Sequence, residues 1–386
     1  MTTRFEFATV PRIVFGAGAA GHIGAQVKSF GRRALIVTGR DPHRADKLLA
    51  NLAASGISAA TFPVAGEPEI ATVENGVLFA KKEHCDFVIG FGGGSVIDAG
   101  KAVAAMLANE GELYDYLEIV GRGQSLKKPS APFVAIPTTA GTGAEVTRNA
   151  VLSAPEQRVK VSLRSPLMLA RIAVVDPELT YGLPPAPTAF TGLDALTQLI
   201  EPYVCLRANP MTDSYCVEGI HRVARSLRVA VFNGENHAAR EDMALASLFG
   251  GLALANAGLG AVHGFAGPIG GGFPAPHGAI CAALLPHVMM MNLRALRDRE
   301  PQNPALARYQ KVAALLTGNP HATADTGAEW VQTFIADLNI PRLGVYGLRE
   351  EHIADLVTKA TNASSMKANP IVLTPAELAQ TLRQAL

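Results

Sequence analysis

Two histidines lie in a part of the chain that contains no charged side chain. The segment AVHGFAGPIGGGFPAPHG, residues 261–278, contains His263 and His277, and no Asp, Glu, Lys or Arg occurs from Met243 to Leu293. A single buried histidine is most often hydrogen-bonded within the protein core. A pair of histidines can instead bind a metal ion, which would require at least one further oxygen or nitrogen ligand.

A carboxylate that could complete such a site stands in TGLDALTQLIEPYV, residues 191–204. Asp194 and Gln198 are spaced i, i+4 and would share one face of a helix. Taken alone, Asp194 is more simply a solvated side chain or a carboxylate near a helix start. Together with two imidazoles it forms a ligand set that suits catalytic zinc or ferrous iron and leaves a coordination position open.

Two glycine-rich segments compete as phosphate-binding loops. The first, GAGAAG, contains Gly16, Gly18 and Gly21 in a literal GxGxxG pattern, with Asp41 roughly twenty residues further on. A turn of small residues between a strand and a helix explains this pattern equally well.

The second segment is DFVIGFGGGSVIDAGK, in which a buried strand leads into Gly92, Gly93, Gly94 and Ser95 and then into a helix. Glycines let the backbone approach a pyrophosphate closely, and the helix N-terminus supplies N–H donors. Ala102 stands where a triphosphate-binding loop has Ser or Thr. The segment therefore favours a dinucleotide over a triphosphate.

A third segment, IPTTAGTGAEVTRNAV, gathers polar side chains just after a predicted strand. Hydroxyl and amide groups there can bind ribose or nicotinamide, although turn chemistry also explains them. Open α/β sheets bind ligands at the ends of their strands. The presence of three such loops near strand ends therefore strengthens the prediction of a nucleotide-binding site. The polar residues are Thr138, Thr139, Thr142, Thr147 and Asn149.

Composition excludes several classes of function. A chain of 386 residues suggests about two domains. The formal net charge of +1 provides no basic field for nucleic acid. Four cysteines without CxxC spacing, and an N-terminus without an apolar segment, indicate a reducing, cytoplasmic compartment. Prolines, glycines and polar residues interrupt the uncharged segment, so we expect no membrane span.

Hydrophobic runs and helical patterns alternate in the first half, which predicts parallel βαβ units. After Leu183 the pattern is helical only, and the boundary falls in TYGLPPAPTAF. We therefore expect an α/β dinucleotide-binding domain over 1–182 and a helical metal and substrate domain over 183–386. The predicted strands are 34–38, 58–62, 86–91, 132–137 and 172–176, and the predicted helices are 43–55, 70–83 and 95–108.

The order of these motifs resembles the iron-containing, or group III, alcohol dehydrogenases. FGAG, GGGSVIDAGK, PTTAGTGAEVT, GLDALT and VHGFAGPIGGGFPAPHG follow one another over nearly the full length. The resemblance implies a dehydroquinate synthase-like architecture, with an α/β N-terminal dinucleotide-binding domain, an all-α C-terminal domain and a metal in the cleft between them. It also implies that the pyrophosphate binds the GGGS loop and that the first glycine cluster is structural.

The resemblance implies that Asp194, His263 and His277 bind Fe²⁺ or Zn²⁺ and act in catalysis through this metal. The family pattern DALTH is DALTQ in this chain, so Gln198 occupies the fourth ligand position. The family's HxxxH pattern, whose second histidine serves proton transfer near the nicotinamide, has Gly267 in that place. We expect three strong ligands and a proton path through water or a cofactor hydroxyl.

The cofactor is expected to be NADP or NAD. Where NAD enzymes place an acid after the strand ALIVT, this chain has Gly39, and Arg40 with Arg44 could bind a 2′-phosphate. NADP(H) should therefore be used at least as well as NAD(H), and Asp41 in the NAD role is the alternative. The other cofactor-binding residues expected are Gly93, Gly94, Ser95, Asp98, Thr138, Thr139, Thr142, Thr147, Asn149 and Lys160.

These expectations together describe a cytoplasmic homodimer that interconverts a small alcohol and an aldehyde or ketone. Two other readings stay open. One is a metal-free reductase of the same fold, and the other is a nucleotide-binding protein without activity. Gln198 and Gly267 are the sequence support for the second of these.

Overall fold

The computed structural model describes residues 4–157 and 159–386, and this part of the chain forms two compact units. The α/β unit comprises Thr9–Thr139 and Gly143–Tyr181. The helical unit comprises Ala140–Thr142, Gly182–Leu386 and the N-terminal residues 4–8. The expected fold class, an α/β dinucleotide-binding fold followed by an all-α fold, is confirmed.

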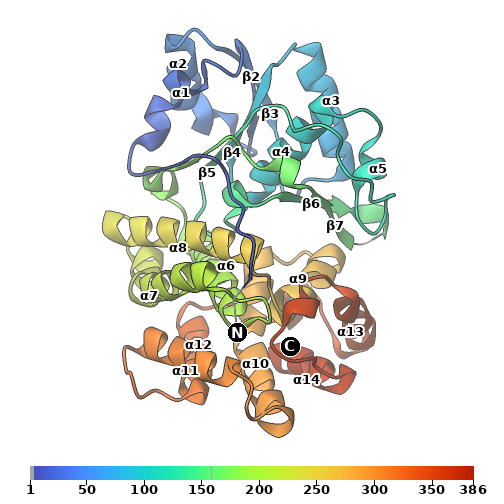
Figure 1. Ribbon diagram of the computed structural model, residues 1–386. Helices are drawn as coiled ribbons and strands as arrows, with labels where there is room; N and C mark the ends of the chain where they lie inside the picture. Colours follow the sequence, from blue (N-terminus) through green and yellow to red (C-terminus); the bar gives the residue numbers. More distant parts are fainter. Residues whose placement is uncertain (1–3, 158) are drawn as a thin grey trace. The chain divides into compact units, whose positions relative to one another are not determined.

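Within the described residues, a six-stranded parallel sheet forms the centre of the α/β unit (Figure 1). Its order is β1, β8, β5, β4, β2, β3, so the chain moves outward from β2 to β3 and returns to the other side of β2. The loops after β2 and β4 therefore diverge at a topological switch point. The strands are β1 (Ile13–Phe15), β2 (Arg33–Thr38), β3 (Ser58–Pro63), β4 (Phe87–Gly92), β5 (Phe133–Pro137) and β8 (Ile172–Val175).

Helices cover both faces of this sheet, as the near-continuous apolar strands require. On one face Ile36 packs with Ile23 and Leu52 from the first two helices. On the other face a Cβ on Gly100 would come within 3.0 Å of Phe133, so glycine allows α4 to lie close to the sheet. The α-helices are α1 (Ile23–Val27), α2 (Asp46–Ala54), α3 (Ile70–Lys82), α4 (Gly94–Ala108) and α5 (Leu113–Tyr116). The 3-10 helices are η1 (Ala19–His22), η2 (Pro42–Ala45), η3 (Ala144–Val146), η4 (Pro155–Gln157), η5 (Pro166–Met168) and η6 (Pro177–Thr180).

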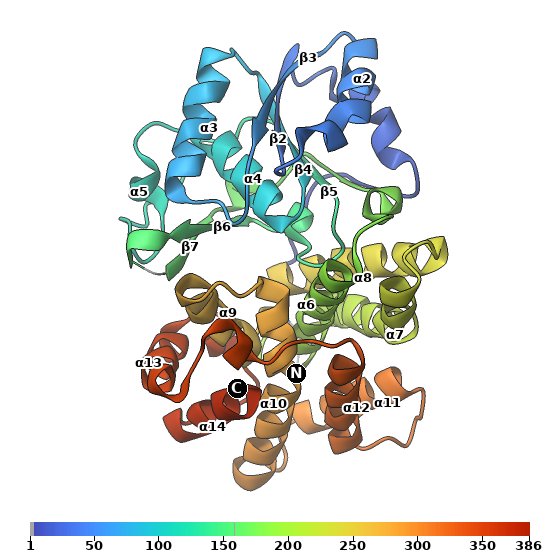
Figure 2. The same ribbon diagram turned by 180° about the vertical axis from the view of Figure 1, so that it is seen from behind.

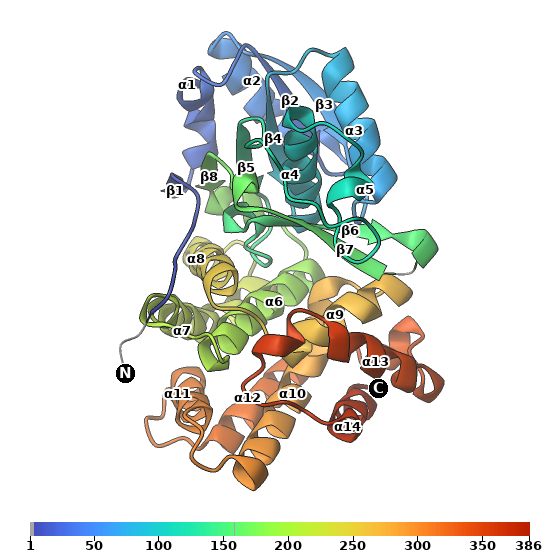
Figure 3. The same cartoon turned by 45° about the vertical axis from the view of Figure 1, so that its right-hand side comes forward.

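An antiparallel pair, β6 (Asn149–Ala154) and β7 (Val159–Arg164), forms a separate ribbon in the α/β unit (Figure 3). The sequence analysis did not anticipate it. Buried and half-buried residues alternate along β6, which is the pattern of a strand with one covered face. The ribbon is held to α4 because Val151 N donates a hydrogen bond to Asp98 Oδ2 at 3.1 Å.

In the helical unit, α10 runs between two groups of helices, α9, α13 and α14 on one side and α11 and α12 on the other (Figure 2). Of the prolines of the predicted boundary, Pro184 precedes α6, and Pro185 and Pro187 lie in its first turn. The α-helices are α6 (Pro185–Val204), α7 (Pro210–Phe232), α8 (His237–Asn256), α9 (Ala261–Gly272), α10 (His277–Arg299), α11 (Ala305–Thr317), α12 (Ala324–Asp337), α13 (Ile353–Asn362) and α14 (Pro375–Ala385). The 3-10 helices are η7 (Leu343–Tyr346), η8 (Glu350–His352) and η9 (Met366–Ala368).

The uncharged segment forms most of α8, all of α9 and the first part of α10. Of the described residues, only α10 is by itself long and apolar enough for a membrane span, and 83% of its apolar window is buried inside the protein. The pair α8 and α9 is bent by 98° at its break. Burial within the helical unit accounts for the missing charges, since unpaired charges are costly in a core.

Candidate active site

Side chains from three helices converge within the helical unit. Asp194 lies in the middle of α6, His263 in the first turn of α9 and His277 at the start of α10. Asp194 Oδ1 is 3.4 Å from His263 Nε2 and 3.7 Å from His277 Nε2. The structure thus brings together the carboxylate and the two imidazoles that the sequence singled out.

The spacing of these atoms fits a divalent metal ion. Bonds of about 2.0–2.2 Å from nitrogen and oxygen to zinc place tetrahedral ligand atoms roughly 3.3–3.6 Å apart. Asp194 is 2% exposed, and its Oδ1 has no hydrogen-bond partner among the residues that the structure describes. A buried carboxylate oxygen without a hydrogen-bond donor is costly, and a cation would satisfy it.

The electrostatics of the cluster also favour a cation. Burial raises the pKa of Asp194, but His277 and His263 outweigh it, so this pKa is lowered. Burial lowers the pKa of His263, yet its interactions with Cys281, Glu201 and Asp194 outweigh burial and raise this pKa well above its usual value. The pKa of His277 is raised in the same way, against burial, by Cys281 and Asp194. Both imidazoles therefore lie in a negative field.

A buried carboxylate orients His263. Glu201 lies two turns after Asp194 on α6, and its Oε2 is 2.6 Å from His263 Nδ1. Its Oε1 accepts a hydrogen bond of 2.7 Å from Val262 N and so caps the N-terminus of α9. A carboxylate at Nδ1 assigns the ring proton to that nitrogen and leaves the Nε2 lone pair free for a metal.

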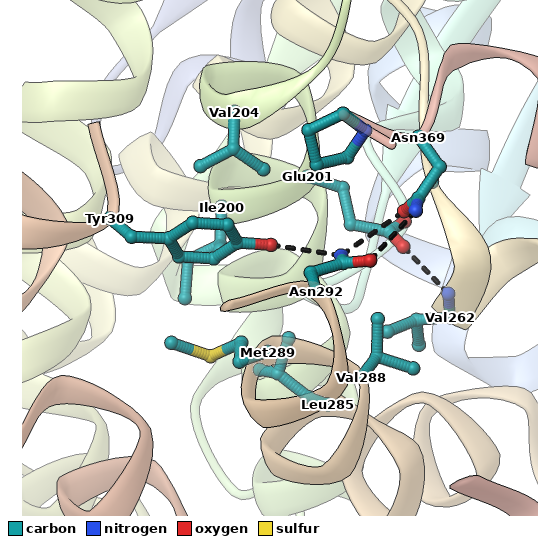
Figure 4. A pocket seen from close by; sticks show the side chains of 12 residues that line it. Ile200, Glu201, Val204, Val262, Leu285, Val288, Met289, Asn292, Tyr309 and Asn369 are labelled. Carbon is teal, nitrogen blue, oxygen red and sulfur yellow. Dashed lines mark hydrogen bonds between the residues drawn. The ribbon is translucent and has the colours of Figure 1, made fainter. Parts of the chain in front are cut away.

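A small cavity beside Glu201 is crossed by a network of amides (Figure 4). Asn369 Nδ2 donates to Asn292 Oδ1 at 2.8 Å, and Asn292 Nδ2 donates to the Tyr309 hydroxyl at 3.0 Å. Asn369 Oδ1 accepts from the first backbone N–H of α9 at 3.1 Å. A Cβ on Gly260 would lie 2.8 Å from Glu201 Oε1 and 2.9 Å from Asn369 Oδ1. Glycine therefore lets both groups approach the start of α9, where they fix His263.

The sequence analysis missed two residues of this cluster, Glu201 and Cys281. Cys281 Sγ is 3.7 Å from His277 Nε2 and 3.8 Å from His263 Nε2. One ligand atom each from Asp194, His263, His277 and Cys281 lies within 4.8 Å of the others. A signal was present, because Cys281 follows His277 by four residues and Glu201 follows Asp194 by seven, both helical spacings.

Gln198 and Gly267 mark the two departures from the family pattern. Gln198 lies one turn after Asp194, is 3% exposed, and its Oε1 has no hydrogen-bond partner within the described part of the chain. Its side chain lies against Gly250 of α8, where a Cβ would be 3.6 Å from Oε1. Gly267 lies in α9, and a Cβ there would meet no described atom within 4 Å.

In the α/β unit, neighbouring parallel strands end side by side. Thr38 of β2 pairs with Phe91 of β4, and Gly92 of β4 pairs with Pro137 of β5. The loops that begin at 39, 93 and 138 therefore share one edge of the sheet, which we call the nucleotide edge. The helix α4 begins at Gly94, so the free N–H groups of its first turn lie at this edge.

Several side chains predicted to bind the cofactor have partners inside the α/β unit. Asp98 Oδ2 accepts from the backbone of β6, and burial raises the pKa of Asp98 to about 6 against the attraction of Lys101. Thr147 Oγ1 accepts a 2.9 Å hydrogen bond from the buried Lys101 ammonium. Lys160 forms a 3.0 Å ion pair with Glu67.

Lys101 ties the Thr-rich segment to α4. It is 0% exposed and donates to Ala144 O, Thr147 Oγ1 and Asn149 O at 2.7–2.9 Å. Thr138 and Thr139 follow β5 directly at the nucleotide edge. Thr142 lies instead in the short segment that belongs to the helical unit.

The end of β2 has open space and a free hydroxyl. A Cβ on Gly39 would meet no described atom within 4 Å, and Arg40 is exposed. Thr38 Oγ1 is buried without a hydrogen-bond partner among the described residues. Asp41 caps η2 through His43 N at 3.0 Å, and Arg44 donates to a backbone carbonyl of η6 at 3.4 Å. Asp41 and Arg44 thus already have hydrogen-bond partners within the α/β unit.

Backbone N–H groups of the first glycine cluster already bind a side chain of the protein. Gly18 N and Ala20 N each donate a 3.0 Å hydrogen bond to the carboxylate of Asp176. Gly18 has a φ of +76°, which favours glycine. These donors therefore close the loop on the end of β8, in agreement with a structural role for this cluster.

Comparison with known proteins gives a consistent result. Residues 11–177 match the family model of iron-containing alcohol dehydrogenases, and residues 188–386 match the C-terminal model of the Fe-containing alcohol dehydrogenase family. The 1,3-propanediol dehydrogenase of Citrobacter freundii is 37% identical, and the NAD-dependent methanol dehydrogenase of Bacillus methanolicus is 35% identical. The alignments cover 100% and 99% of this chain, respectively, and 100% of each relative. A crystal structure of a 1,3-propanediol oxidoreductase superposes with a TM-score of 0.91 at 36% identity, over 100% of both chains. The chain therefore belongs to the iron-containing alcohol dehydrogenase family.

Proposed function

We propose that this protein is an NAD(P)-linked oxidoreductase that interconverts an alcohol and an aldehyde or ketone at a divalent ion, Fe²⁺ or Zn²⁺, held by Asp194, His263 and His277. The observation that carries this proposal is the approach of both Nε2 atoms to one buried carboxylate oxygen that lacks a hydrogen-bond donor in the described part of the chain. The names of the relatives, which are dehydrogenases of small alcohols, support the reaction class.

Each residue of the cluster has a defined task in this reaction. The bound ion supplies Lewis acidity, which polarises the substrate oxygen. Asp194 contributes the negative charge that offsets the cation, and Glu201 holds the Nδ1 proton of His263, so that Nε2 is the ring nitrogen that would face the ion. Gln198 offers at best a neutral amide oxygen, a weaker donor than imidazole for these metals.

The proton that accompanies hydride transfer has no side chain to receive it at position 267. Glycine there leaves open space, because a Cβ would meet no described atom within 4 Å. We assign the proton path to water or to a hydroxyl of the cofactor ribose. A bound nicotinamide would supply the hydride chemistry, so no protein group would need to carry the hydride.

The cofactor is proposed to bind the nucleotide edge, with its pyrophosphate at Gly93, Gly94 and Ser95. The start of α4 supports this placement, since its N–H groups lie there. Its other contacts are proposed at Gly39, Arg40, Asp98, Thr138, Thr139, Thr142, Thr147, Asn149 and Lys160.

The space beside Gly39 and the exposed Arg40 support use of NADP(H) at least as well as NAD(H). Gly39→Asp should shift the preference toward NAD(H), because the carboxylate accepts ribose hydroxyls and repels a 2′-phosphate. Gly39→Ala adds the Cβ without the charge and should leave the preference unchanged. A strong NADH preference of the unmodified enzyme would remove Gly39 from the discriminating role.

Turnover tests the proposal directly. The purified protein should oxidise or reduce nicotinamide cofactor with members of a panel of short alcohols, diols and aldehydes, followed by the absorbance of the reduced nicotinamide. Absence of turnover across the panel, with cofactor binding intact, would favour an inactive nucleotide-binding protein.

We further propose a cytoplasmic homodimer with domains over 1–182 and 183–386. Light scattering on the purified chain tests its oligomeric state.

A further inference from the structure

The ligands implied by the family motifs do not include Cys281, whose sulfur atom lies beside Asp194, His263 and His277. Cys281 lies one turn after His277 on α10, so both side chains occupy the same face of that helix. Its thiol is 0% exposed. Sγ lies 3.7 Å from His277 Nε2 and 3.8 Å from His263 Nε2. The sulfur is therefore beside the two nitrogen atoms proposed to bind the ion.

These distances are those of hydrogen bonds between the thiol and the imidazoles, and they also suit atoms that share one ion. Zinc binds nitrogen at about 2.0–2.1 Å and thiolate sulfur at about 2.3 Å, so a tetrahedral site places N and S roughly 3.6 Å apart. The observed separations differ from this value by only one or two tenths of an ångström. Small side-chain adjustments thus suffice to bring Sγ into the coordination sphere.

Gln198 is a poorer candidate for the fourth ligand. Its Oε1 is also buried without a hydrogen-bond partner among the described residues, but a neutral amide oxygen is a weaker donor than a thiolate for zinc-like ions. The side chain lies against Gly250 of α8, where a Cβ would be 3.3 Å from Gln198 Cβ and 3.6 Å from its Oε1. In contrast, the sulfur of Cys281 already lies within 4.8 Å of one candidate ligand atom each from Asp194, His263 and His277.

We propose that Cys281 supplies a thiolate as the fourth protein ligand of the ion, in place of the histidine that Gln198 replaces. This inference rests on the metal site of the proposed function. A mixed ligand set of one sulfur, two imidazoles and one carboxylate favours Zn²⁺ and Co²⁺ over harder ions such as Mg²⁺ and Mn²⁺. The enzyme should therefore select a softer ion than an all-nitrogen-and-oxygen site would.

Cobalt substitution tests the sulfur ligand independently of turnover. The full-length protein is stripped of metal and titrated with Co²⁺ alone, while bound cobalt is counted per chain. Coordination by sulfur produces an intense near-ultraviolet charge-transfer band. We expect one Co²⁺ per chain with this band. Cys281→Ser should abolish the band while cobalt remains bound through Asp194 and the two histidines.

Cys205→Ser is the matched control, because Cys205 is also buried but follows α6, eleven residues after Asp194, and is not among the candidate ligand atoms. This variant should keep the band. Zn²⁺ affinity should fall in Cys281→Ser by more than the roughly 10–100-fold that loss of an outer partner costs. Adding Gln198→His should restore the affinity without restoring the band.

The outcomes separate the two proposals. One Co²⁺ bound without the band in the unmodified protein, or a band that survives in Cys281→Ser, would overturn the sulfur ligand and leave the metal site intact. If the unmodified protein binds no Co²⁺, Zn²⁺ or Fe²⁺, both the sulfur ligand and the metal-dependent function are wrong.

Discussion

In the helical unit, the side chains that the sequence singled out lie beside one another and leave a buried oxygen of Asp194 without a hydrogen-bond donor in the described chain. Among the α/β-unit residues expected to bind the cofactor the opposite holds, because Asp98, Thr147 and Lys160 already bind partners within their own unit. The candidate metal site thus depends on side-chain atoms that already lie at the distances a bound ion requires. The nucleotide edge depends on backbone N–H groups and on empty space.

This contrast predicts different consequences of substitution in the two regions. A change in the metal cluster should act through the lost chemical group, whereas a change at the nucleotide edge should act through the volume that it fills. Metal content and cofactor binding measure the two regions separately.

The largest effect is expected for Asp194→Ala. Loss of the carboxylate should remove stoichiometric metal and lower kcat/KM roughly a thousandfold or more, since Lewis-acid stabilisation is worth several kcal/mol at about 1.4 kcal/mol per tenfold. Asp298→Ala is the matched control, because its side chain is 68% exposed on α10. An Asp194→Ala variant with normal turnover would remove this residue from the site.

Glu201→Gln should have the next largest effect. The substitution removes the charge at His263 Nδ1, and loss of such an outer partner typically weakens metal affinity about 10–100-fold. Competition with a chelator of known affinity measures this change. Glu218→Gln on the surface of α7 is the control. Unaltered metal affinity in Glu201→Gln would show that this carboxylate serves only to cap α9.

Gly94→Val tests the nucleotide edge. The branched side chain should fill the space that the phosphates need, and raise the cofactor KM about tenfold or more, equivalent to about 1.4 kcal/mol or more of lost binding. Metal content should not change. Gly21→Val in the first glycine cluster is the matched control, because a Cβ there meets no described atom within 4 Å. If Gly21→Val impaired cofactor binding and Gly94→Val did not, the pyrophosphate would belong to the first cluster.

A further effect concerns the stability of the protein and comes from Glu145, a buried acid of the α/β unit. Burial raises the pKa of Glu145 from 4.5 to about 7, against the attraction of Lys101. Between these pH values the folded protein keeps a proton that the unfolded chain releases, so the free energy of unfolding should fall as pH rises. Each unit of difference corresponds to about 1.4 kcal/mol.

Glu145→Gln stays neutral and should remove this fall. The Tm of the unmodified protein should therefore decrease relative to the Tm of Glu145→Gln as the pH rises from 4.5 to 7. Glu74→Gln on the exposed face of α3 is the control. Parallel Tm curves for Glu145→Gln and the unmodified protein would mean that Glu145 ionises normally in the fold. Asp98, with a pKa raised to about 6, should contribute in the same direction.

The sequence predicted the sheet well because each of its central strands is a continuous apolar run, as in β2 and β4. It did not predict the β6–β7 ribbon, whose short alternating strands follow a segment rich in turn-forming residues. That ribbon is held by Asp98 and Lys101 from α4, a long-range contact that local patterns do not contain.

The candidate site divides in the same manner. His263, His277 and Asp194 were visible from their chemistry and from the family motifs. Glu201 and Cys281 were missed, because their meaning depends on which faces of α6, α9 and α10 meet. Spacing alone places each residue on the face of its own helix, and only packing decides what lies opposite.

The central claim is that turnover requires an ion at Asp194, His263 and His277. Its most direct test is to remove metal with a chelator, count the ions per chain by elemental analysis, and measure alcohol oxidation before and after adding back Zn²⁺ or Fe²⁺. We predict about one ion per chain in the active protein, loss of turnover on its removal and recovery on its return. Full turnover by the metal-free protein would contradict the account and favour a reductase that acts through hydrogen bonds alone.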